Sequence, residues 1–100
     1  MTLTEVRRRR QEILDILGRA GAGNVRVFGS VARGDADEHS DLDLLVDLAK
    51  PQPRGFAYFG LIDELQRELA AALDRPVHVV DVDDPATPAG RKILAEAVPL

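Results

Sequence analysis

Two short motifs in the first half of the chain carry residues suited to binding a phosphate and a metal ion. Gly29 and Ser30 open a turn that Gly34 can close, and Asp41 and Asp43 follow a few residues later. Backbone N–H groups at a tight turn can hold phosphate oxygens, and paired carboxylates can hold the divalent cation that neutralises their charge. A nucleoside triphosphate needs both groups at one site, so the spacing predicts binding of a nucleotide with its cation.

The two aspartates begin an apolar segment that is typical of a β-strand, from about residue 41 to residue 47. Side chains two residues apart on a strand point to the same side, so Asp41 and Asp43 are expected to project together. The run Leu44 to Val46 is wholly apolar, which predicts that both faces of the strand are covered. An Asp-x-Asp pair by itself also fits two solvated loop carboxylates, so its meaning depends on the turn upstream.

That turn follows a short run of β-branched and aromatic residues, predicted as a strand over 24–28. Gly29 permits a sharp bend and close approach of a ligand to the backbone, and Ser30 is expected to cap the helical turn over 30–33. An ordinary strand-to-helix turn with a serine cap explains the same residues. The chain has neither a P-loop motif nor a dinucleotide-binding glycine fingerprint.

The combined pattern of Gly29-Ser30, Arg33-Gly34 and Ser40-Asp41-x-Asp43 resembles the signature of the nucleotidyltransferase superfamily related to DNA polymerase β. The short chain and the form of segment 29–47 resemble the minimal nucleotidyltransferases, the MNT family. The tail, 91–98, is similar to that family's closing helix, so the resemblance extends over residues 6–98.

The resemblance implies an antitoxin that transfers AMP from ATP to a tyrosine hydroxyl of a HEPN-domain ribonuclease toxin. A hetero-oligomer of the two proteins is compatible with it. It implies that Gly29 and Ser30 hold the β- and γ-phosphates. Asp41 and Asp43 would hold Mg²⁺. Arg33 either contacts phosphate or forms an exposed salt bridge with a nearby aspartate.

The chain departs from the family at the third carboxylate of the site, where the equivalent position holds His78. Asp81 is the nearest acid, but on a regular strand it faces the opposite side from His78 and would need a bulge to join the site. His78 could be a metal ligand, a general base near pH 7, or a hydrogen-bonded residue of a half-buried strand. Imidazole is a poorer ligand for Mg²⁺ than an oxygen donor.

This departure leaves a second function open, in which a catalytically degenerate module neutralises its partner by occlusion. Transfer to a small molecule, as in aminoglycoside-modifying relatives, is a third alternative. So short a chain disfavours it, because no second domain remains to enclose such a substrate.

The surrounding segments predict an α/β fold in which helices flank a small mixed sheet of three to four strands. The capping-box spacing of Thr2 and Glu5 predicts a helix to about Arg19. Further segments are a break at 50–55, a helix over 56–73, a strand over 76–82, a turn at 83–88 and a helix over 89–97. Tyr58 and Phe59 are expected to pack in the core or near the entrance of the site.

Bulk properties narrow the possibilities. One hundred residues, 45% hydrophobic and 30% charged, predict a single globular domain over 1–100. The net charge of −4 argues against a nucleic-acid-binding surface, and Arg7 to Arg10 are expected to form a solvated helix face. The chain has no cysteine, no apolar run of about 20 residues and no signal-peptide pattern, so a cytoplasmic protein without a membrane partner is expected.

Overall fold

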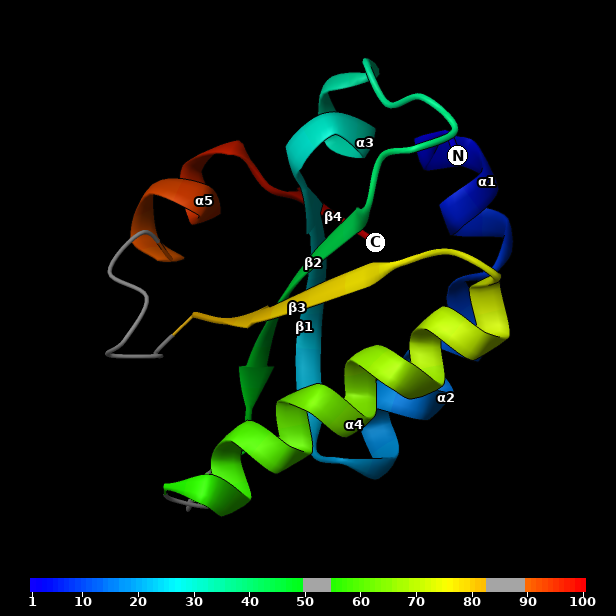
Figure 1. The fold of residues 1–100 in the computed structure, drawn as a ribbon. Coiled ribbons are helices and arrows are strands. Elements are labelled where there is room, and N and C mark those ends of the chain that lie inside the picture. Colours follow the sequence, from blue (N-terminus) through cyan, green and yellow to red (C-terminus); the bar gives the residue numbers. More distant parts are fainter. Residues whose placement is uncertain (50–54, 83–89) are drawn as a thin grey trace.

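The computed structural model of the protein describes residues 1–49, 55–82 and 90–100. A four-stranded sheet with the order β3-β2-β1-β4 lies at its centre (Figure 1). The strands are β1 (Ala22–Phe28), β2 (Leu42–Leu48), β3 (Val77–Asp81) and β4 (Val98–Pro99). β1 runs antiparallel to β2 and β4, whereas β2 and β3 are parallel. The predicted mixed sheet flanked by helices is therefore confirmed.

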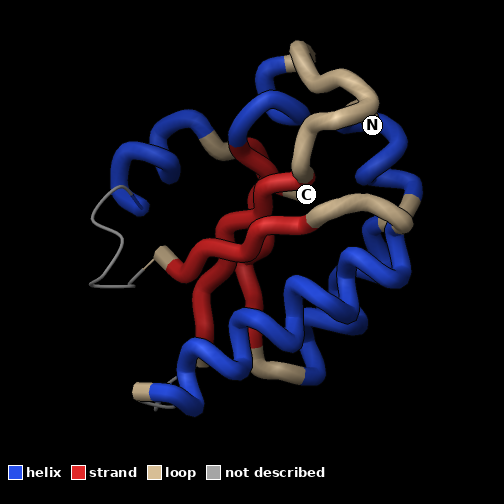
Figure 2. Tube along the Cα trace, in the orientation of Figure 1, coloured by secondary structure: helices blue, strands red, loops and turns tan. Residues whose placement is uncertain are grey.

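Three helices pack against one face of this sheet and enclose the main core. They are α1 (Leu3–Arg8), α2 (Arg10–Arg19) and α4 (Phe56–Leu73). The short helix α3 (Gly29–Arg33) follows β1 at one end of the sheet, and α5 (Gly90–Glu96) contacts β1 and β2. Figures 1 and 2 show α5 at the opposite side of the sheet from α4. The face that carries the site is thus the one the long helices leave uncovered.

The apolar run of β2 is covered on both faces, as its sequence predicts. Leu44, Leu45 and Val46 are all fully buried. Leu44 and Val46 belong to the core cluster under the long helices, whereas Leu45 does not. Alternation along a strand places Leu45 on the other face, the same face as Asp43. Because Asp43 alternates with the core residues Leu42 and Leu44, a slip of one residue would turn its carboxylate into the core, and this fixes the register of β2.

The single helix predicted from Thr2 to Arg19 is wrong at Arg9, where α1 ends and α2 begins. Thr2 does cap the first helix, since its Oγ1 accepts a hydrogen bond from the Glu5 N–H at 3.2 Å. Arg9 has φ −98° and ψ 13°, and its guanidinium donates to the Ala72 carbonyl oxygen at 2.7 Å. Arg9 therefore does not belong to the solvated helix face predicted for Arg7 to Arg10, because its side chain turns toward α4.

Most predicted boundaries agree with the structure to within a residue or two. The helix over 56–73 is confirmed at both ends, and the strands differ by one or two residues at their ends. β4 was not predicted; it is a two-residue strand in which Val98 pairs with Val27. The predicted break at 50–55 and turn at 83–88 fall almost entirely outside the described residues. No helix in the described parts of the chain is long and apolar enough to cross a membrane.

Candidate active site

Asp43 and His78 lie side by side on the face of the sheet that α4 does not cover. They are direct partners in the parallel register of β2 and β3. Their side chains approach each other, with 3.6 Å between His78 Nδ1 and Asp43 Oδ1. The Asp43 side chain is 22% exposed and that of His78 is 57% exposed, so a ligand can reach both from solvent. The strand pairing thus joins a carboxylate and an imidazole, two groups able to bind a metal ion, that are 35 positions apart in the sequence.

Gly29 brings the turn after β1 directly against the Asp43 carboxylate. Phe28 pairs with Asp43 in the antiparallel register, so the chain bends immediately beside that residue. Gly29 has φ +73°, and a Cβ placed on it would overlap Asp43 Oδ2. Only glycine combines this backbone conformation with so close an approach. The two motifs of the sequence therefore meet at a contact between Gly29 and Asp43.

The turn itself is the helix α3, and it differs from its prediction at Ser30. The N-cap is Phe28, with no side-chain cap, so Ser30 lies inside the first helical turn and does not cap it. Gly34 ends the helix in the left-handed conformation, at φ 82°, as predicted. Arg33 pairs through Nε with Asp35 Oδ2 at 3.3 Å. This is the exposed salt bridge that was predicted as the alternative to a phosphate contact.

Asp41 is an exposed residue immediately before β2, and the turn between α4 and β3 holds both of its neighbours. Arg75 Nη1 donates to the Ser40 carbonyl oxygen at 3.0 Å. The Leu42 N–H donates to the Pro76 carbonyl oxygen, also at 3.0 Å. These two bonds fix the backbone on either side of Asp41. Arg75 was not predicted to take part in the site, because nothing in its local pattern connects it with a residue 35 positions away.

The surroundings of Asp43 favour its protonated form. Burial raises the pKa of Asp43, and the charge of Asp41 acts in the same direction. His78 and Arg33 oppose this rise without cancelling it. A carboxylate in this environment is stabilised when a cation binds beside it.

Asp81 does not join the site, because it projects from the opposite face of β3. It pairs with Val46 in the register, and it is only 1% exposed beneath the helices. The Tyr58 hydroxyl donates to Asp81 Oδ2 at 3.0 Å, which connects Asp81 to α4. Tyr58 thus packs against the core as predicted, whereas its neighbour Phe59 is 60% exposed and does not pack in the core, the first of its two predicted places. A regular strand excludes Asp81, and the role of the third group falls to His78 or to no residue.

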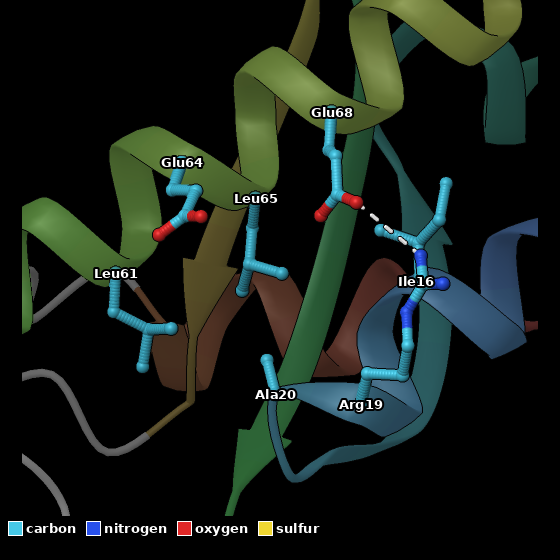
Figure 3. Close-up of a pocket in the computed structure, with 7 residues that line it drawn as sticks. All are labelled: Ile16, Arg19, Ala20, Leu61, Glu64, Leu65 and Glu68. Atoms are coloured by element: carbon cyan, nitrogen blue, oxygen red, sulfur yellow. Dashed lines mark hydrogen bonds and ion pairs between the residues drawn. The ribbon is translucent and has the colours of Figure 1, made fainter.

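A pocket of about 240 Å³ opens between α2 and α4, but it is a poor candidate for the nucleotide (Figure 3). Its lining residues Ile16 and Leu65 belong to the core on the helical face, away from Asp43. Glu64 and Glu68 also line it, and Glu68 pairs with Arg19 at 3.2 Å. Carboxylates in this position repel phosphate, so the pocket does not compete with the face that carries Asp43.

The donor set on that face fits Mg²⁺ through oxygen atoms. Mg²⁺ commonly binds proteins through one or two carboxylates, with phosphate oxygens and water completing its shell. Asp43 supplies such a carboxylate beside the Gly29 turn, and Asp41 lies close enough for its charge to act on Asp43. Among residues 1–49, 55–82 and 90–100, no three His, Cys, Asp or Glu side chains gather into a ready-made metal cluster.

A glycine turn held against a carboxylate on a mixed sheet is an arrangement that could hold the phosphates of a nucleotide. The comparison with known families is specific: the nucleotidyltransferase domain family matches residues 8–99, and the chain belongs to that family. A candidate protein adenylyltransferase of Methanocaldococcus jannaschii is 32% identical, over 98% of this chain and 97% of its own length.

Solved structures agree with this assignment. The structure of a candidate minimal nucleotidyltransferase is 40% identical and superimposes with a TM-score of 0.76, covering 100% of this chain and 97% of the other. A toxin–antitoxin crystal structure with AMP-PNP is 26% identical, with a TM-score of 0.72, covering 89% of this chain and 69% of that chain. The resemblance to minimal nucleotidyltransferases is thereby confirmed.

Proposed function

We propose that this protein is an antitoxin that transfers AMP from ATP to a tyrosine hydroxyl of a HEPN-type ribonuclease toxin and thereby silences it. The contact between the Gly29 turn and the Asp43 carboxylate carries this proposal, because it brings a phosphate-binding element against a cation ligand. The likeness to a candidate protein adenylyltransferase and to a toxin–antitoxin structure with AMP-PNP supports it. We place the protein in the cytoplasm, where ATP is available.

In the proposed reaction the tyrosine oxygen forms a bond to the α-phosphorus of ATP. The bond from that phosphorus to the oxygen bridging to the β-phosphate breaks, and pyrophosphate leaves. Bound Mg²⁺ would neutralise the charge that develops on the phosphates. Asp41 and Asp43 would hold the cation, while Gly29 and Ser30 would donate to the β- and γ-phosphates. The tyrosine proton passes to water.

The first experiment is transfer of label from α-³²P-ATP, in the presence of Mg²⁺, to the product of the neighbouring gene. Label on that protein, absent when Asp43→Asn replaces the parent, is the expected result. Mapping the labelled residue then tests whether the acceptor is a tyrosine. An unlabelled partner that remains active as a ribonuclease in the complex would contradict the proposed function.

A second function is favoured by one observation, the imidazole of His78 where the family has a carboxylate. In this alternative the protein binds its toxin and blocks it without chemistry. The two functions differ in their response to Asp43→Asn. If Asp43→Asn neutralises the toxin as well as the parent does, and the parent itself transfers no label, occlusion is the mechanism.

Arg75 provides a separate test of the site's construction. Arg75→Gln removes the guanidinium that holds the Ser40 carbonyl, so Asp41 loses part of its support. We expect transfer to fall by roughly tenfold, with a loss of unfolding free energy of about 1–2 kcal/mol. Initial rates and urea denaturation measure the two effects.

Arg67→Gln is the matched control for Arg75→Gln, because it also removes an arginine of the same region. Arg67 pairs with Asp63 on the exposed surface of α4, and its side chain is 80% exposed. Both transfer and stability should remain close to the parent values. Equal transfer rates for the Arg75→Gln and Arg67→Gln variants would refute a supporting role for Arg75.

A further inference from the structure

We propose that His78 is a cation ligand and that it makes the site selective for a divalent ion of the Mn²⁺ type over Mg²⁺. The inference rests on the proposed function in one respect, which is that the site binds a cation with a nucleotide. It goes further by assigning the nitrogen donor and the metal preference that this donor imposes.

The separation of the two donor atoms is the first argument. At 3.6 Å, His78 Nδ1 and Asp43 Oδ1 lie beyond ordinary hydrogen-bond distance, although they form an ion pair when the imidazole is protonated. Two neighbouring ligands on one cation, each bonded at about 2.0–2.2 Å, lie roughly 3.0–3.4 Å apart. The observed gap is therefore close to the span of a shared cation, and side-chain adjustments alone can close the difference.

The backbone that carries the two donors is held firmly, which is the second argument. Asp43 and His78 face each other across paired strands, so the ladder fixes the distance between their Cα atoms. β3 is the edge strand, and its outer side is anchored one residue beyond His78. There the Val79 N–H donates to Gln66 Oε1 at 3.0 Å. The backbone at His78 is thus held in place, while its exposed imidazole can still reach a ligand.

Ligand chemistry decides which cation this pair prefers. Mg²⁺ is a hard ion that binds oxygen, and it gains little from an imidazole. Mn²⁺ also accepts carboxylate and phosphate oxygens, and it lies in the first-row series whose later members bind imidazole increasingly well. A carboxylate beside an imidazole therefore shifts the balance toward Mn²⁺ and its heavier neighbours. Replacing the nitrogen by an oxygen should shift the balance back toward Mg²⁺.

The test measures binding and does not depend on turnover. The probe is α,β-methylene-ATP, whose α–β linkage resists cleavage, titrated calorimetrically into the protein with either Mg²⁺ or Mn²⁺. We expect the ratio of the two dissociation constants, Mg²⁺ over Mn²⁺, to fall by about tenfold or more from the parent to His78→Asp. His78→Ala should lower the same ratio, which guards against an effect peculiar to the new aspartate.

His39→Ala is the matched control, since His39 is the other histidine of the chain and lies in an exposed loop. Its ratio should equal that of the parent. Pulsed electron paramagnetic resonance on the Mn²⁺ complex adds a direct signature, because a bound imidazole couples the ¹⁴N nucleus to the metal. This coupling should be present in the parent and in His39→Ala, and absent in His78→Asp.

The outcomes separate this inference from the proposed function. If the analogue binds with the same Mg²⁺ to Mn²⁺ ratio in the parent and in His78→Asp, or if the parent shows no ¹⁴N coupling, His78 is not a ligand while nucleotide binding stands. If the analogue binds with neither cation, the proposed function fails as well. If the ratio shifts but no label reaches the partner, the metal assignment holds and the transfer reaction is wrong.

Discussion

Asp43→Asn should reduce AMP transfer by on the order of 100- to 1,000-fold. Asparagine keeps the size of the side chain but removes the negative charge that would hold the cation against the Gly29 turn. Initial rates of label transfer at saturating ATP measure the loss. Asp63→Asn is the matched control, because Asp63 pairs only with the exposed Arg67 among the described contacts. A transfer rate for Asp43→Asn equal to that of the parent would remove Asp43 from the site.

The same substitution should not weaken the fold, because burial raises the pKa of Asp43 in the folded protein. The folded state then binds this proton more tightly than the unfolded state does. Stability therefore falls as pH rises from the unfolded value of about 3.9 through the higher folded pKa. At pH 7 without a divalent cation, the parent carries this penalty and Asp43→Asn does not.

Urea denaturation at two pH values checks the direction of this pH dependence of stability. At pH 7 the variant should be at least as stable as the parent, and its advantage should shrink as pH falls toward 4. Adding Mn²⁺ or Mg²⁺ with a nucleotide should stabilise the parent and leave the variant nearly unchanged. A variant that is less stable than the parent at pH 7 without cation would mean that the Asp43 charge supports the fold.

Gly29→Ala should lower the unfolding free energy by at least about 2 kcal/mol and abolish transfer. Two physical effects combine here, the positive φ of +73° and the overlap of the new Cβ with Asp43 Oδ2. Equilibrium urea unfolding gives the first quantity and label transfer gives the second. Gly18→Ala is the control, because Gly18 lies in α2 with open space around it, and the change should stabilise the helix by about 0.5–1 kcal/mol.

A double-mutant cycle separates the two effects at Gly29. In an Asp43→Ala background the carboxylate is absent, so Gly29→Ala should cost only the strain of the positive φ. The destabilisation by Gly29→Ala should therefore be smaller in that background than in the parent. Equal losses in both backgrounds would show that the carboxylate does not constrain position 29.

The sequence alone was sufficient for the motifs, the family and the core of the central strand. The run Leu44 to Val46 predicted cover on both faces because a strand buried on both sides cannot alternate polar and apolar residues. Alternation along β3 also predicted that Asp81 faces away from His78, and the register confirms it. These successes share one cause: the backbone of a regular strand fixes where each side chain points.

Short-range capping patterns were less reliable. Ser30 has the residue type of a cap but lies within α3, because the helix already begins at Gly29, whose positive φ is available to glycine. The helix predicted through Arg9 breaks there, and Arg9 donates instead to a carbonyl of α4. At Arg9 the outcome depended on a neighbour distant in the sequence, which local propensity does not include.

The assembly of the site was decided by tertiary structure. Parallel pairing of β2 with β3 brings His78 to 3.6 Å from Asp43, and the turn before β3 places Arg75 on the Ser40 carbonyl. No spacing in the sequence specifies these contacts, because strand order and register arise from burying one face of the sheet under α2 and α4. The residue types could thus be read from the chain, whereas their distances came only from the packed sheet.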